Sequence, residues 1–169
     1  MSNPVRLELF SKYFSRPVAE TAAQSLSDGV EIAIQVISAP KTGASAPTSG
    51  ENVLETLVFT REKKRNCIKN IAPHQPQLTF RMTEAAAEAL LSDPSDQIGE
   101  IGVNILRLIF SPDPTKRIWI QFQSGFFTLW SKGYFGVLKA GGSGFAAYLA
   151  SRGFSGMDAI KAALRKIRG

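Results

Sequence analysis

Few side chains in this chain of 169 residues are of the types that act as nucleophiles, proton-transfer groups or metal ligands. It contains one cysteine, Cys67, and one histidine, His74. A single thiol excludes an internal disulfide and a zinc site of several cysteines, and a single imidazole excludes the usual histidine-rich sites. The two residues could still meet in space as a nucleophile and its base. A cysteine in a strand is more often a small buried residue, so we expect no catalytic residue, metal or cofactor.

Two further groups of residues resemble chemical sites. Gly141, Gly142 and Gly144 precede a predicted helix, as in a phosphate-binding loop. The segment before them is also predicted to be helical and no Gly-Lys-Ser or Gly-Lys-Thr follows, so a tight turn between helices is the better interpretation. Five carboxylates lie in the range 84–100. Acids near helix N-termini on solvated faces explain them better than a cation site.

Positive charge is concentrated in two regions of the sequence. The formal net charge is +6, and the range 116–169 holds nine basic residues and one acidic residue. A second basic block lies around Arg61 to Lys69. A basic face attracts anionic membranes, nucleic acid or acidic ligands, although an ordinary solvated surface has the same composition. No motif that reads nucleic acid is present, so nucleic acid is not the expected partner.

The segment from Phe122 to Phe135 is unusually aromatic. It holds six aromatic side chains, and Lys132 and Lys139 lie beside them. These rings could be ordinary core, since aromatic side chains usually bury. They could also form the wall of an apolar cavity or a lip that faces a membrane, with the lysines contacting anionic headgroups.

Hydrophobic periodicity predicts the elements that must position these residues. Asn3 and Pro4 begin a helix that bends or restarts at Pro17. Strands are expected over 30–37, 53–60, 66–71, 77–82 and 117–123, with a long hairpin loop over 39–52. Helices are expected over 84–91, capped by Thr83, and over 96–110, 133–139, 144–151 and 155–169. Residues 125–131 fit either an extended strand or a helix.

Strands and helices grouped in this order predict an α+β fold. We expect one domain over 1–169, with an antiparallel-rich, twisted sheet of about five strands covered by helices and with extra C-terminal helices. No stretch reaches the roughly 20 apolar residues of a membrane span, and residues 1–8 do not form a secretory signal. One free cysteine fits a reducing compartment, so a cytoplasmic location is expected.

The stretch from Gln77 to Leu91, Gln-Leu-Thr-Phe-Arg-Met-Thr-Glu-Ala-Ala-Ala-Glu-Ala-Leu-Leu, resembles the sterol carrier family of the second type, also called non-specific lipid-transfer proteins. The pattern of elements is similar over about Pro4 to Lys139. The late strand lacks the Gly-Lys run and the following Gly-Asp or Gly-Asn of many members. A helical extension over 141–169 also continues about thirty residues past the family's usual end.

The resemblance implies an apolar tunnel that holds a fatty acyl chain, a sterol or a similar lipid, with no catalytic residue. Burial of each methylene contributes about 0.8 kcal/mol. The expected walls share the apolar strand face, the helix stripe or the aromatic segment, and they are Phe80, Met82, Leu91, Ile101, Ile105, Ile109, Phe122, Phe127 and Trp130. Tyr134 and Lys132 are expected to meet a headgroup. Plain core packing would explain any one of these residues equally well.

Three functions remain open from the sequence. The first is a carrier or transfer domain for a lipid or another hydrophobic molecule, in transient contact with anionic membranes. The second is a basic interaction module that binds nucleic acid or a protein. The third is a small acyl-ester hydrolase that uses Cys67 or His74.

Overall fold

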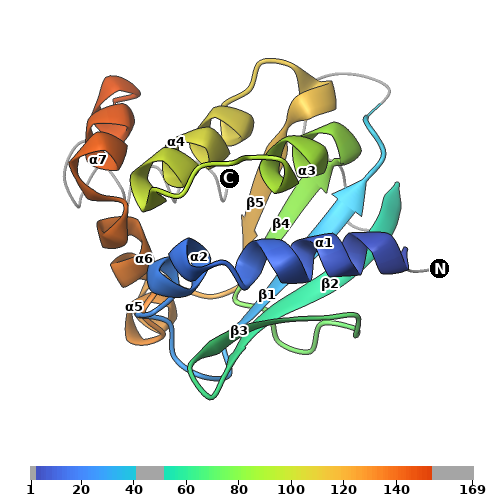
Figure 1. Cartoon of the computed structure of the whole chain (residues 1–169), viewed down its shortest axis with the longest axis horizontal. Helices are drawn as coiled ribbons and strands as arrows, with labels where there is room; N and C mark the ends of the chain where they lie inside the picture. The colour runs from blue at the N-terminus through green and yellow to red at the C-terminus, as the bar shows by residue number, and fades with distance from the viewer. Residues whose placement is uncertain (1–2, 41–51, 154–169) are drawn as a thin grey trace.

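The computed structural model describes residues 3–40 and 52–153, which form one five-stranded sheet and the helices around it (Figure 1). The strands are β1 (Glu31–Ile37), β2 (Val53–Glu62), β3 (Arg65–Lys69), β4 (Leu78–Thr83) and β5 (Ile118–Phe122). The helices are α1 (Pro4–Phe14), α2 (Pro17–Ala22), α3 (Glu84–Leu91), α4 (Ile98–Ile109), the short 3-10 helix η1 (Pro114–Lys116), α5 (Phe126–Ser131), α6 (Tyr134–Ala140) and α7 (Gly142–Ser151).

The sheet has the strand order β3-β2-β1-β4-β5. All neighbouring strands are antiparallel except β1 and β4, which run parallel. Ile34 of β1 lies opposite Leu57 of β2 and Phe80 of β4. Because side chains alternate along a strand, this register gathers the apolar side chains of the three central strands on one face. The fold is therefore the expected α+β class with a mostly antiparallel sheet of five strands.

Helices α1 to α4 cover that apolar face, while α5, α6 and α7 lie together at one end of it (Figure 1). The core combines Phe10 of α1, Val36 of β1, Leu57 of β2 and Ala86 of α3, all of them buried. Nothing in the described ranges forms a helix both long and apolar enough to cross a lipid bilayer.

Two predicted helix starts are confirmed in atomic detail. The Asn3 side chain accepts a hydrogen bond from the backbone N–H of Val5 at 3.1 Å, and Pro4 takes the first helical position. Thr83 Oγ1 accepts from the backbone N–H of Ala86 at 3.2 Å. Such caps satisfy backbone donors that the first turn leaves without a partner. They also set the axial position of α1 and α3 over the sheet.

Residues 125–131, which the sequence left undecided, form α5. Gly133 then reverses the chain with a φ of +87° before α6 begins. The predicted helices over 133–139 and 144–151 are present as α6 and α7, and α7 begins two residues early at Gly142. The predicted helix over 155–169 and most of the loop over 39–52 lie outside the described residues.

Candidate functional site

Two apolar cavities lie side by side between the sheet and its helices. The first has a volume of about 250 Å³ and lies among β1, β4, β5, α4, α6 and α7. Its walls include Leu78, Ile109, Ile120, Phe122, Phe135 and Phe145. The second has a volume of about 220 Å³ and lies toward α1, α2 and α4. Its walls include Phe14, Ile34, Phe59, Met82, Ile101 and Ile105.

Four residues separate the two cavities and line both of them. They are Leu26, Ile32, Phe80 and Val137. Ile32 and Phe80 come from the core face of β1 and β4, Leu26 from the turn before β1, and Val137 from α6. Each cavity exceeds the roughly 150 Å³ at which an apolar void can stay dry and accept a small apolar molecule. Their combined volume lies within the range of about 300–1,000 Å³ that is typical of ligand pockets.

Very few of the lining residues carry a polar side-chain atom. Tyr134 lines the first cavity, and its hydroxyl donates a hydrogen bond of 3.3 Å to Gln77 Oε1. Burial raises the pKa of Tyr134 well above its usual value, so the phenol stays neutral. Tyr13 and Arg16 line the second cavity. The remaining walls of both cavities are almost entirely carbon, which favours an apolar occupant.

A groove outside the first cavity lies between α6 and α7. Its volume is about 580 Å³, and four of its lining residues also line the first cavity: Phe135, Leu138, Phe145 and Leu149. Trp130 lines this groove and is 57% exposed. Its ring lies 5.4 Å from the ring of Phe135, which reaches inward to the cavity. The groove is therefore the place where the first cavity comes nearest to aromatic side chains of the surface.

Seven of the eleven residues proposed from the sequence line a cavity. Phe122, Ile109 and Tyr134 line the first, Met82, Ile101 and Ile105 line the second, and Phe80 lines both. The strand members are there because they alternate onto the helix-covered face, as expected. Ile101, Ile105 and Ile109 follow one stripe of α4, whereas Tyr134 begins α6.

The other four proposed residues lie elsewhere. Leu91, at the end of α3, packs against the core without lining a cavity. Phe127 is 86% exposed, because α5 turns this residue to solvent while Leu129 points inward. Trp130 lines the outer groove only. Lys132 caps the end of α5, where its carbonyl accepts a hydrogen bond of 3.0 Å from Ser27 N–H.

The sequence analysis missed most of the contribution of α6 and α7. Val137, Leu138, Phe145 and Leu149 line the first cavity, and Leu26 divides the two. Apolar residues four apart, as in Tyr134 with Leu138 and Phe145 with Leu149, signalled one buried face on each helix. That signal identifies a buried face, but not the cavity behind it.

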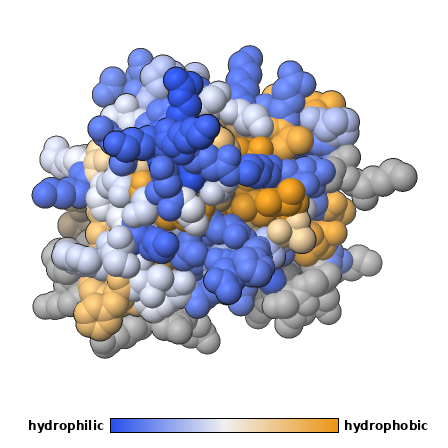
Figure 2. Space-filling view, turned by 90° about the horizontal axis from the view of Figure 1, so that it is seen from below, coloured by the Kyte–Doolittle hydropathy of each residue, from blue (hydrophilic) through white to orange (hydrophobic). Residues whose placement is uncertain are grey.

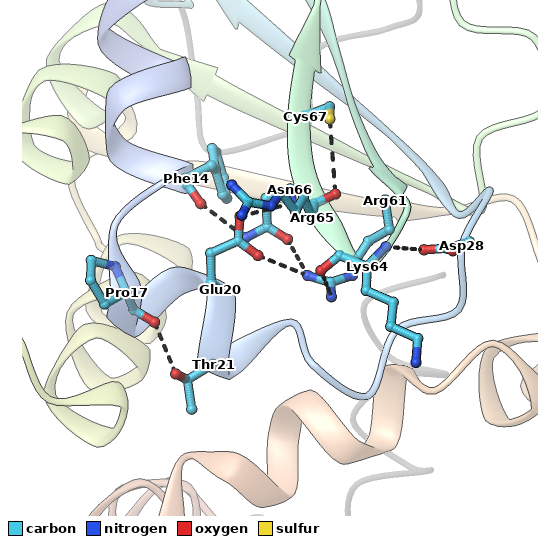
Figure 3. Close-up of polar contacts among 10 residues, drawn as sticks. All are labelled: Phe14, Pro17, Glu20, Thr21, Asp28, Arg61, Lys64, Arg65, Asn66 and Cys67. Atoms are coloured by element: carbon cyan, nitrogen blue, oxygen red, sulfur yellow. Dashed lines mark hydrogen bonds and ion pairs between the residues drawn. The ribbon is translucent and has the colours of Figure 1, made fainter.

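Part of the basic block around Arg61 to Lys69 is structural (Figure 3). Arg61 is 3% exposed, and its Nη1 lies 3.2 Å from Glu20 Oε2 and 2.6 Å from Asn66 Oδ1. Glu20 Oε1 also accepts from the backbone N–H of Asn66, and the Asn66 amide donates to the carbonyl of Phe14. This network fastens the β2–β3 hairpin to α1 and α2. Arg61 is therefore not a surface cation available to a nucleic acid.

The side chains that could catalyse lie away from the cavities. Cys67 is half-buried on β3 and its thiol faces the Arg65 carbonyl at 3.9 Å. His74 is exposed in the connection before β4, where its backbone N–H bonds to Glu31. Glu84 is engaged by Arg6 at 3.0 Å. In the part of the chain that the structure describes, no three His, Cys, Asp or Glu residues gather in a way that could hold a metal ion.

The surface around the hairpin is mixed in character. Figure 2 views the molecule from the lower side of Figure 1, where hydrophilic residues cover the middle of the face and apolar residues gather in separate patches beside them. Exposed large apolar residues include Phe127, Trp130, Leu54 and Val5.

Comparison with known proteins adds one similar structure. No family model matches the chain, and no curated protein matches it. A solved structure described as "UbiJ-SCP2 Ubiquinone synthesis protein" is similar to it with a TM-score of 0.40 and 13% sequence identity, over 79% of this chain and 90% of that chain. The likeness is weak at this TM-score, so the geometry of the two cavities is what indicates the kind of molecule that this fold can hold.

Proposed function

We propose that this chain binds a hydrophobic molecule, such as a fatty acyl chain, a sterol or a similar lipid, and acts as its carrier. The observation that carries the proposal is the pair of adjoining apolar cavities between the sheet and the helices. Empty apolar space forgoes packing contacts that a ligand would restore. A ligand methylene buried there contributes about 0.8 kcal/mol, so a chain of several methylenes suffices for useful affinity.

A long ligand would occupy both cavities and would displace part of their shared wall. Phe80 of the sheet and Val137 of α6 both belong to this shared wall. Single-bond rotations of such side chains take place within nanoseconds to microseconds when space is available. A ligand that threads past them would extend from the α1–α2 side to the α6–α7 side.

The ligand would be collected from a membrane at the α5–α6 end. Phe127 and Trp130 are exposed there, and Trp130 connects through Phe135 to the first cavity. Lys132 and Lys139 lie beside these rings, and the sequence from Pro114 to Met157 contains no aspartate or glutamate. Aromatic rings with neighbouring cations suit the headgroup region of an anionic bilayer.

We also propose that binding involves no catalysis, because Cys67 and His74 line neither cavity. The same placement argues against the acyl-ester hydrolase. The basic-module alternative is favoured by no specific contact, since the basic block around Arg61 to Lys69 is partly occupied by the Arg61 network.

A larger side chain in the shared wall, which reduces the space between the cavities, tests the proposal. Val137→Phe places a larger side chain where the cavities meet, and we expect it to weaken binding of a fluorescent long-chain fatty acid by about tenfold or more. Val5→Phe is the matched control, because Val5 is 60% exposed on α1 and lines neither cavity. Circular dichroism would establish that both variants keep the fold. Equal affinity in both variants and the unmodified protein would contradict ligand binding in these cavities.

A further inference from the structure

Two residues that line the second cavity each carry a buried hydrogen-bond donor without an acceptor in the described part of the chain. Tyr13 is 6% exposed, and among the described residues its hydroxyl has no hydrogen-bond partner. Nη2 of Arg16 is likewise buried without a partner. Both residues line the second cavity. A buried polar group left without a partner is costly, so two of them in one wall call for an explanation.

The Arg16 guanidinium is close enough to the Tyr13 hydroxyl to counteract part of the rise in its pKa, but no hydrogen bond within 3.5 Å joins the hydroxyl to Nη2. The Arg16 guanidinium carbon lies 4.2 Å from the centre of the Tyr13 ring, so the guanidinium stacks on the ring face. Its Nε donates to the Tyr13 carbonyl, and Nη1 donates to the carbonyls of Asp93 and Ser95, each at 3.2 Å. These bonds hold the guanidinium in place and leave Nη2 without a hydrogen-bond acceptor among the described residues.

The positive charge of Arg16 also has no counter-ion within ion-pair distance in the described ranges. Asp93 interacts with Arg16 electrostatically, but its Oδ1 accepts from Ser95 N–H and its Oδ2 accepts from the Asn104 amide. Burial would raise the pKa of Asp93, but these hydrogen bonds and the Arg16 charge outweigh it and hold that pKa below the usual value. Burial raises the pKa of Tyr13 to about 12, so its hydroxyl remains a donor at neutral pH.

Arg16 lies between an apolar cavity and a groove of mixed polar and apolar lining. It lines the second cavity and also a neighbouring groove of about 710 Å³, whose other walls include Thr21, Ser95, Asp96 and Gln97. Val18 and Ile98 line both spaces as well. A molecule with a polar end and an apolar tail would therefore find water and polar groups at Arg16 and carbon beyond it.

We propose that Arg16 and Tyr13 bind the carboxylate of an amphipathic lipid, a fatty acid or a molecule with the same acidic end, whose tail runs through the two cavities. This inference rests on the proposed function. It adds that the ligand has an acidic end and that this end lies at Arg16, with the tail in the cavities. A carboxylate accepts from several donors at once and neutralises the guanidinium, which makes it the acceptor that this pair lacks.

The test compares dodecanoate with its methyl ester, which keeps the chain and removes the charge. Titration calorimetry at pH 7 should show the unmodified protein binding the acid about tenfold or more tightly than the ester. Arg16→Gln should abolish that preference. Tyr13→Phe should weaken binding of the acid several-fold, leave the ester unchanged, and leave the melting temperature of the unliganded protein equal or higher, because it removes an unsatisfied hydroxyl.

The chain contains a second tyrosine–arginine pair that serves as the matched control. Arg152 Nη2 lies 3.2 Å from the Tyr148 hydroxyl on α7, and neither residue lines a cavity. Tyr148→Phe and Arg152→Gln should leave both affinities unchanged. If Arg16→Gln fails to fold, the isosteric Tyr13→Phe still decides. Equal binding of acid and ester by the unmodified protein overturns the carboxylate site alone, whereas binding of neither molecule overturns the proposed function itself.

Discussion

Gly133 shows how one residue determines where the cavity wall lies. Its φ is +87°, and a Cβ on this residue would lie 1.8 Å from the backbone carbonyl oxygen of Ser25. The Ser25 hydroxyl in turn donates to the Gly133 carbonyl at 2.9 Å. Only glycine allows both the left-handed conformation and this approach. The contact fixes α6, and with it Val137, against the turn that carries Leu26.

Gly133→Ala should therefore lower the free energy of unfolding by at least about 2 kcal/mol, because it adds a backbone clash to the cost of a positive φ. Chemical denaturation would measure the change. Gly142→Ala separates the two costs, since Gly142 has a φ of +71° but nothing within 4 Å of its would-be Cβ. We expect a loss of about 1 kcal/mol there. Equal losses in the two variants would show that the Ser25 contact does not matter.

At the scale of elements, α5 carries the features expected of a membrane contact. It is a helix of six residues between Gly125 and Lys132. Its residue Leu129 points inward and is buried, whereas Phe127 and Trp130 are exposed. The ring of Phe126 lies next to the rings of Phe127 and Phe135. Exposed aromatic rings next to lysines are the side chains that the proposed membrane contact would use.

Phe127→Ser should weaken binding to vesicles that contain phosphatidylserine by about tenfold, because it removes the most exposed ring from the lipid interface. Lys132→Gln should weaken binding several-fold, and added salt should diminish that second effect. Co-sedimentation with vesicles measures both. Val5→Ser, an exposed apolar position on α1, is the control and should leave binding unchanged. Vesicle binding that is the same in all three variants would rule out α5 as the contact.

How far the sequence predicts the site differs between these elements. The alternation of Phe80 and Met82 and the stripe of Ile101 and Ile105 were readable locally, because a strand or a helix presents one face to its core. Phe127 was expected to be a wall and proved to be exposed. Its orientation depends on residues 125–131 being a helix and on where Gly133 docks, and neither follows from local periodicity.

For the whole molecule, the two apolar cavities predict that ligand binding and stability are coupled. A ligand that binds only the folded state stabilises it by about 2.7 kcal/mol at a free concentration of one hundred times its Kd. For a chain of this length that corresponds to a rise in Tm of about 5–10 °C. Differential scanning fluorimetry with a bound fatty acid would measure the rise.

The same measurement on Val137→Phe should show a smaller rise at equal ligand concentration, because the added ring occupies the space between the cavities. Val5→Phe should match the unmodified protein. A ligand that raises Tm equally in both variants must bind somewhere other than the shared wall.

The sequence by itself determined the fold class, the order of elements, the capped starts of α1 and α3 and the apolar faces of β1 and β4, because these follow from residue type and short-range spacing. Only the tertiary structure decided that Leu26 and Val137 divide two cavities and that Tyr13 and Arg16 leave donors unpaired in one of them. Leu26 and Val137 are more than one hundred residues apart in the chain. A cavity is the space that packed elements fail to fill, so it depends on their relative positions, which no local pattern encodes.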